Sequence, residues 1–128
     1  MMEVLVTLVI IGVIAGLALP AYFSTVEQGR TNEARVNLAI IRMGEKIYAT
    51  NNSGAYWLPG ASPSVNSINT TLNVDISPQY YDITSITGNN AAVPPTLSIV
   101  ATRNATAGGN GTTTCTIDQN GNPPGNGC

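Results

Sequence analysis

The sequence predicts an α+β protein, in which one long N-terminal α-helix packs through its C-terminal half on a small antiparallel β-sheet. Two observations indicate this class. Apolar side chains keep a helical spacing through about the first 50 residues, where Pro20 is the one proline. The later residues are rich in Asn, Thr, Gly, Ser and Pro around short β-branched runs, as in strands joined by turns.

The first segment, residues 1–26, is predicted to be an apolar helix that can span a membrane. No charged residue lies between Glu3 and Glu27, and a bilayer core requires roughly 20 apolar residues in a helix. A buried core helix is one alternative, but the rest of the chain is too short to surround it. A signal peptide is another, but such peptides begin with a basic flank, whereas this segment begins Met1-Met2-Glu3.

Residues 27–50 are predicted to continue the helix with one apolar face. The recurring apolar residues are Val36, Ile40, Met43 and Ile47. Their spacing places them on one side of a helix, and we expect that side to pack on the sheet. Three further residues widen the face: Ala34, Leu38 and Ile41. The charged residues lie mostly off it: Arg30, Glu33, Arg42, Glu45 and Lys46.

Residues 51–128 are predicted to form a Thr-, Asn- and Gly-rich β domain. Strands are expected at Tyr80–Thr87, Thr96–Arg103 and Thr112–Asp118, because each run has β-branched residues and is flanked by turn residues. A sheet of three or four antiparallel strands would cover the apolar face of the helix. The connector Asn51–Asp75, which contains Pro59 and Pro63, is expected to be irregular.

Composition argues against several classes of function. Charged residues make up 9 % of the chain, the net charge is −2, and there is no His. The usual acid–base group and the commonest metal ligand are therefore absent from the sequence, and five scattered basic residues do not form a nucleic-acid surface. The sequence has no nucleophile motif and no paired carboxylates, so we expect neither an enzyme nor a cofactor.

Cys115 and Cys128 are the two cysteines, and we expect them to form a disulfide. The even count, the polar low-charge domain and the apolar N-terminal helix all favour an oxidising compartment. The bond would close a loop of about 14 residues and stabilise the fold by about 3 kcal/mol in the chain-entropy model. The alternative is a pair of reduced, unrelated thiols.

The N-terminal residues resemble those of a bacterial type IV pilin. The resemblance rests on Glu3-Val4-Leu5, on the apolar run containing Gly12 and Gly16, and on Pro20-Ala21-Tyr22. It implies a pilin-like fold and a structural subunit that polymerises through its apolar helix into an extracellular filament, used in adhesion, motility or DNA uptake. A major pseudopilin of a type II secretion system is an alternative. A membrane-tethered binding module that does not polymerise is a second alternative, from a different class.

The resemblance also implies roles for particular residues. Glu3 would meet the N-terminal amine of a neighbouring subunit, and the helix would melt between Gly12, Gly16 and Pro20 in the filament. The implied partners are other copies of the chain, the inner membrane before assembly, the pilus assembly machinery and a prepilin peptidase, whose product is N-methylated. Glu3 lies two positions nearer the start than in the family. We therefore expect a leader and two mature residues to be missing, a real shortening being the alternative.

Possible modification sites are less specific. Asn51, Asn69, Asn104 and Asn110 each begin an Asn-x-Ser/Thr triplet, so each is a possible glycosylation site, and the Thr- and Ser-rich strands could equally carry O-linked sugar. Calcium could bind Asp118 and the carbonyl groups of residues 121–127, but one carboxylate is a thin ligand set. No metal site is therefore assigned.

Overall fold

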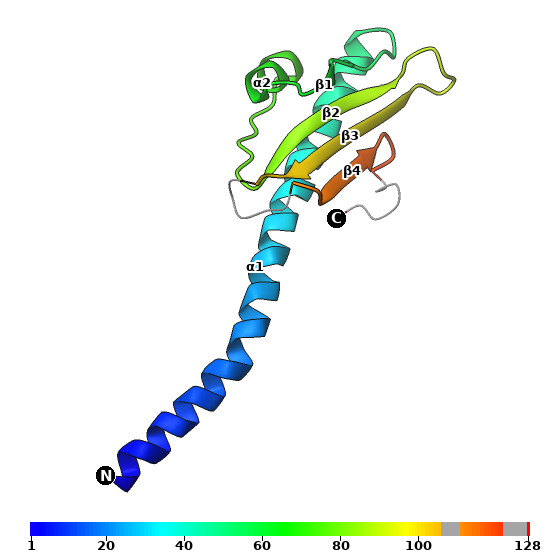
Figure 1. The fold of residues 1–128 in the computed structure, drawn as a ribbon. Coiled ribbons are helices and arrows are strands. Elements are labelled where there is room, and N and C mark those ends of the chain that lie inside the picture. Colours follow the sequence, from blue (N-terminus) through cyan, green and yellow to red (C-terminus); the bar gives the residue numbers. More distant parts are fainter. Residues whose placement is uncertain (106–110, 122–127) are drawn as a thin grey trace. The chain divides into compact units, whose positions relative to one another are not determined.

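The computed structural model describes residues 1–105, 111–121 and 128 (Figure 1). In chain order the elements are α1 (Met2–Asn51), β1 (Gly60–Ala61), α2 (Val65–Leu72), β2 (Tyr81–Asn89), β3 (Thr96–Arg103) and β4 (Thr114–Asp118). The chain divides into two compact units, Met1–Arg30 and Thr31–Cys128, called here the N-terminal unit and the globular unit. The predicted α+β class, a long helix and an antiparallel sheet, is confirmed.

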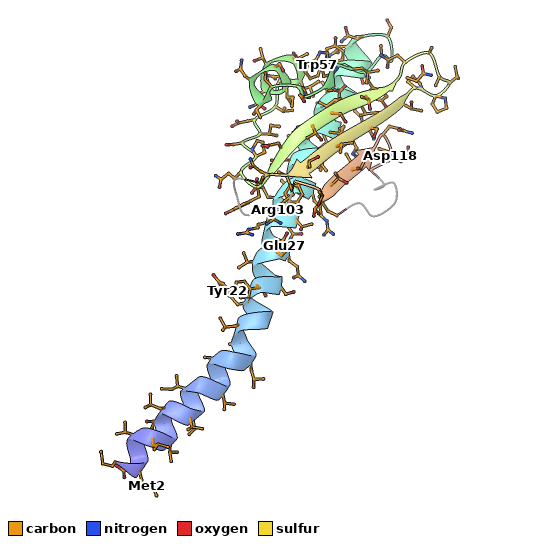
Figure 2. The ribbon with its side chains drawn as sticks, in the orientation of Figure 1. Met2, Tyr22, Glu27, Trp57, Arg103 and Asp118 are labelled. Carbon is orange, nitrogen blue, oxygen red and sulfur yellow. A yellow bond between two sulfur atoms is a disulfide. The ribbon has the colours of Figure 1, made fainter. Side chains whose placement is uncertain are left out.

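The N-terminal unit is helical from Met2 onward and exposes apolar side chains in all directions (Figure 2). Each large apolar residue between Val4 and Leu19 is more than half exposed. The hydroxyl groups of Thr7 and Thr25 donate to the carbonyl oxygens of Val4 and Ala21, one turn earlier in the same helix. The two Thr side chains therefore meet their hydrogen-bonding needs within the helix, as a membrane requires.

The sheet of the globular unit has four antiparallel strands in the order β1-β2-β3-β4. The long central ladder pairs Tyr81 with Arg103 at one end and Asn89 with Thr96 at the other, with an irregularity between Ile83 and Ser85. Residues on β3 alternate regularly between buried and half-exposed or exposed positions, so one face of the strand enters the core. Three of the four strands lie where the sequence predicts them, within about two residues.

The core lies between this sheet and the part of α1 that belongs to the globular unit (Figure 1). The buried positions of α1 in this region include Ala34, Leu38, Ile41, Glu45 and Ala49. They recur at intervals of three or four residues and so form one stripe of the helix, called here the core stripe. It meets buried side chains of the sheet, the largest of which are Tyr81, Ile86, Leu97 and Ile99.

The predicted packing face of α1 is wrong. Val36, Met43 and Ile47 are 58 %, 58 % and 63 % exposed, and Ile40 is only partly buried. The residues expected merely to widen the face, Ala34, Leu38 and Ile41, are in fact its centre. Both sets have helical spacing, so periodicity alone does not distinguish them. Contacts with distant segments distinguish them, since the sheet and the region around Leu72 and Val74 pack on one side of the helix.

Gly44 shows how close this approach is. A Cβ atom added there would lie 2.8 Å from Cγ1 of Val74 and 3.0 Å from Cβ of Leu72. Both residues belong to the region after β1, where the sequence predicted an irregular connector. That expectation is wrong, because α2 (Val65–Leu72) forms there and is capped by Ser64, whose side chain accepts from the Ser67 N–H. The short length of α2 and its Thr and Asn content hid it from a periodicity analysis.

Replacement of Gly44 by Ala tests this packing. Overpacking costs about 1–3 kcal/mol, and the contacts at 2.8 and 3.0 Å place Gly44 in the upper part of that range, above the gain of about 1 kcal/mol in helix propensity. We expect Gly44→Ala to lower the melting temperature of the purified chain in detergent by about 4 °C or more. Gly29→Ala is the matched control, because a Cβ there meets nothing within 4 Å. An equal effect of both substitutions would refute the close approach at Gly44.

Candidate assembly site

Glu3 lies in the first turn of α1 and is exposed. A carboxylate near a helix N-terminus interacts favourably with the helix dipole. Its neighbours along the chain are apolar and exposed, with Val4 at 61 % and Leu5 at 62 %. Glu3 thus places a carboxylate at the N-terminal end of an apolar surface, and the described residues of the unit give it no ion pair.

Gly12, Gly16 and Pro20 all lie inside α1. A Cβ added at Gly12 or at Gly16 would meet no atom within 4 Å, so packing inside this chain does not require either glycine. The helix that contains them is long and apolar enough to cross a membrane by length and composition. Melting of this stretch in a filament stays a prediction, because the structure is that of a single chain.

A second apolar surface lies on the globular unit. It consists of Val36, Met43 and Ile47 on α1, the residues that the sequence assigned to the core. We call this set the outer helix face. Its existence could have been predicted from the helical region, since apolar residues there occur on more than one side. What the sequence could not show is which side the sheet covers.

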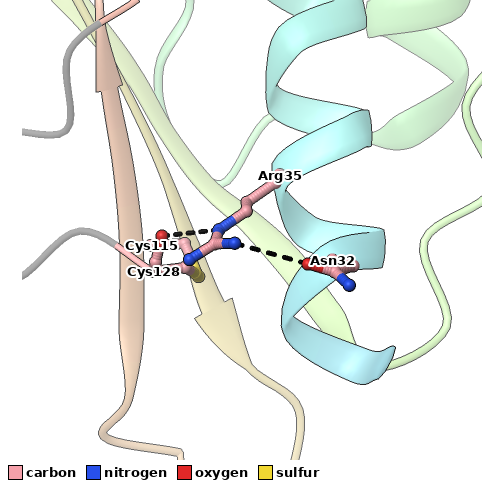
Figure 3. Close-up of a disulfide and its surroundings, with 4 residues drawn as sticks. All are labelled: Asn32, Arg35, Cys115 and Cys128. Carbon is pink, nitrogen blue, oxygen red and sulfur yellow. Dashed lines mark hydrogen bonds between the residues drawn. A yellow bond between two sulfur atoms is a disulfide. The ribbon is translucent and has the colours of Figure 1, made fainter. Parts of the chain in front are cut away.

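The disulfide between Cys115 and Cys128 is present, with its Cα atoms 4.9 Å apart. Arg35 connects it to α1 (Figure 3). The Nε–H of Arg35 donates to the main-chain oxygen of Cys128 at 2.6 Å, and its Nη1 lies 3.4 Å from Oδ1 of Asn32. The arginine thus fastens the end of the disulfide loop directly to the helix, a role that the sequence gave no sign of.

Other charged side chains of α1 also bind main chain from the surrounding loops. Oε1 of Glu33 accepts from the N–H of Gln79 at 2.6 Å and of Tyr80 at 3.3 Å, just before β2. Nη1 of Arg42 donates to the carbonyl oxygen of Gln119 at 3.5 Å, after β4. Carboxylates take N–H groups and guanidinium groups take carbonyl groups, as their hydrogen-bonding capacity requires. The charges that the sequence placed toward solvent therefore organise the loops.

Glu45 is the most deeply buried of these charged residues, with no exposed surface. Its Oε2 accepts from the main-chain N–H of Trp57 at 2.8 Å, while its Oε1 is buried without a hydrogen-bond partner. Burial raises the pKa of this carboxyl group to about 7, against a smaller lowering by the Trp57 hydrogen bond. The sequence prediction that Glu45 lies off the packing face is therefore wrong. It occupies the core stripe because that stripe was misassigned.

The possible glycosylation sites differ in their surroundings. Asn51 is exposed at the end of α1. Asn69 uses its whole amide locally, with Nδ2 donating to the Ile76 carbonyl and Oδ1 accepting from the Ile76 N–H. Asn104 donates to Oδ1 of Asp82, and Asn110 lies outside the described residues. Modification of any of them stays a prediction.

The part of the chain that the structure describes was searched for groups of metal-ligating side chains. It contains no cluster of three or more His, Cys, Asp or Glu that could hold a metal ion. The carboxylate of Asp118 accepts from the N–H of Asn120, and most of the carbonyl groups considered with it, those of residues 122–127, lie outside the described range. What the chain presents instead is an apolar helix with Glu3 at its start and the outer helix face.

Comparison with known proteins was made at three levels. Family models, curated protein sequences and solved structures were all compared with the chain, and none of them matches it.

Proposed function

We propose that this chain is a structural subunit that polymerises through its apolar N-terminal helix into an extracellular filament of the type IV pilus class. In this proposal the helix lies in the inner membrane before assembly and packs with other copies of itself afterwards. Adhesion, motility and DNA uptake are the activities that such a filament serves. The assembly machinery and a prepilin peptidase are its proposed protein partners.

The outer helix face is the observation that carries the proposal. A tether needs apolar residues only where it crosses the bilayer, and the uncharged stretch between Glu3 and Glu27 already supplies them. Val36, Met43 and Ile47 belong to the globular unit and are more than half exposed. Soluble domains seldom leave such a patch uncovered unless another molecule binds it. A second copy of the chain is the natural occupant, because its own apolar helix also needs cover outside the membrane.

Glu3 adds a second argument. A carboxylate among apolar residues costs several kcal/mol in lipid or in a packed filament if it has no partner. A simple membrane anchor gains nothing from such a residue. A filament subunit benefits from it, because pairing of the carboxylate with a positive group of a neighbouring copy fixes the register of one copy against the next.

Removal of the Glu3 carboxylate tests this role. In cells that produce the filament, we expect Glu3→Ala and Glu3→Gln to reduce surface filaments at least about tenfold, equivalent to about 1.4 kcal/mol of assembly free energy. Membrane insertion of the chain should persist, because the apolar helix is intact. Thr7→Ala is the control, since its hydroxyl bonds only within its own helix turn. Normal filaments from the Glu3 variants would show that the Glu3 carboxylate is not needed for assembly.

A charge on the outer helix face provides an independent test. Met43→Glu should leave the melting temperature of the isolated chain nearly unchanged, because exposed substitutions usually alter stability by no more than about 0.5 kcal/mol. Filaments counted by electron microscopy should nevertheless be lost. Met43→Leu keeps the apolar contact and should assemble normally. Filament formation by both variants would show that this face stays in solvent.

The helix within the filament gives a third test. We expect residues between Gly12 and Pro20 to be non-helical and extended in the assembled form, although they are helical in the single chain. A filament map at a resolution that shows the main chain would decide this. A continuous α-helix through that stretch in the assembled form would contradict the expectation.

A further inference from the structure

The segment that follows α1, residues 55–58, is held by hydrogen bonds on two sides. Residues 55–58 are half-buried and pack on the core. On one side, the N–H of Trp57 donates to Oε2 of Glu45 at 2.8 Å. On the other side, Asn90 binds Tyr56 twice, because its Oδ1 accepts from the Tyr56 N–H and its Nδ2 donates to the Tyr56 carbonyl, both at 2.9 Å. The segment therefore connects α1 to the turn between β2 and β3.

The two oxygens of the Glu45 carboxyl group have hydrogen-bonding needs that depend on whether the group is protonated. An ionised carboxylate accepts at both oxygens, whereas a neutral carboxyl group carries a proton on one of them. Oε1 has no partner and is shielded from solvent. A neutral group with its proton on Oε1 keeps Oε2 as the acceptor for Trp57, and its unpaired O–H costs less than an unpaired charge would. An ionised group would be left with a buried, uncompensated charge, which is costly.

Among the residues that the structure describes, no cation forms an ion pair with Glu45. The titratable groups on α1 near Glu45 and on the elements packed against it are Arg42, Lys46, Tyr48, Tyr56, Asp75, Tyr80, Tyr81, Asp82, Arg103 and Asp118. Among the described residues, the one hydrogen bond of Glu45 is that to Trp57. Arg42, one turn earlier, directs its guanidinium group to Gln119 and lies close to Gly121. Arg103 lies over the ring of Tyr81.

We propose that Glu45 and the main chain of Trp57 form a proton-operated latch, in which residues 55–58 stay against α1 while the carboxyl group is neutral and move away when it ionises. Ionisation by itself strengthens the hydrogen bond from the Trp57 N–H, but the larger cost of a buried charge is relieved when the segment opens and water reaches the carboxylate. Because Tyr56 is bound to Asn90, release also loosens the turn between β2 and β3. This device is independent of filament assembly and would operate in a single chain.

The direction of the pH dependence follows from the shift of the pKa from 4.5 to about 7. A raised pKa in the closed state means that the closed state prefers the proton. Its advantage is fully present below pH 4.5 and is lost as the pH rises through about 7. A shift from 4.5 to about 7 limits the change in the ratio of closed to open chains to roughly 300-fold, reached when opening restores the ordinary pKa.

The sequence makes this latch unusually easy to test. Trp57 is the single tryptophan, so its fluorescence reports on the segment alone. The chain has no His, which is the side chain that ordinarily titrates between about pH 5 and 8. Signals in that range can therefore be assigned to Glu45 by one substitution.

The experiment uses the full chain in detergent micelles, with acrylamide quenching of Trp57 and the carboxyl ¹³C signal of Glu45 measured from about pH 3 to about pH 9, which includes both the ordinary and the raised pKa. We expect quenching to rise at least about twofold with a midpoint above about pH 6, and the carboxyl ¹³C signal of Glu45 to titrate with it. Glu45→Gln, which stays neutral and keeps an acceptor for Trp57, should show low quenching at every pH. Glu33→Gln is the matched control, because it removes a carboxylate that binds loop main chain elsewhere, and should keep the transition.

Four results would each overturn the latch. The first is a Glu45 carboxyl signal that titrates near its ordinary value of 4.5, and the second is equal quenching of Trp57 at both ends of the pH range. The third is a transition in quenching that persists in Glu45→Gln. The fourth is a parallel loss of helical circular dichroism, which would mean global unfolding. If Glu45→Gln does not fold, the ¹³C titration and the quenching curve of the wild-type chain still decide the question.

Discussion

The packing of the core stripe of α1 on the sheet is the constraint on which the rest of the globular unit depends. Successive residues of a helix are fixed at about 100° from one another. Once Ala34, Leu38 and Ile41 enter the core, the direction of every other side chain on this part of α1 is set. Val36 and Met43 must then face away, and Glu45 must face inward. A single packing choice thus creates both the outer helix face and the buried carboxyl group.

The same packing arrangement explains why most charged side chains of the packed part of α1 form hydrogen bonds with loop main chain rather than ion pairs with each other. Arg30 and Glu27 form an ion pair within the helix itself. Glu33, Arg35, Arg42 and Glu45 instead bind N–H or carbonyl groups of loops that surround the core. Bonds to ionised groups, as at Glu33, Arg35 and Arg42, are worth more than bonds between neutral groups. A domain with few charged residues therefore uses those on its helix to hold the ends of its strands and its disulfide loop.

The two apolar surfaces have different consequences for function. The N-terminal unit can be covered by lipid, because its length and composition suit a bilayer. The outer helix face belongs to the globular unit, and lipid is not its natural cover. A filament covers both surfaces with copies of the same chain, which is why the proposal of a polymerising subunit accounts for more of the exposed apolar area than a tether does. The Glu45 latch stands apart from this argument, since it concerns a loop inside one chain.

The sequence by itself determined the elements with strong local signals. The apolar N-terminal helix, three of the strands, the disulfide pair and the α+β class follow from composition, periodicity and turn residues, which act over a few neighbouring positions. Only the tertiary structure decided which face of α1 is buried, that α2 forms in the connector, and that Glu45 lies in the core. The physical reason is that two stripes of α1 have the same helical spacing. The choice between them depends on how closely distant segments approach small residues such as Gly44, a contact that no local pattern records.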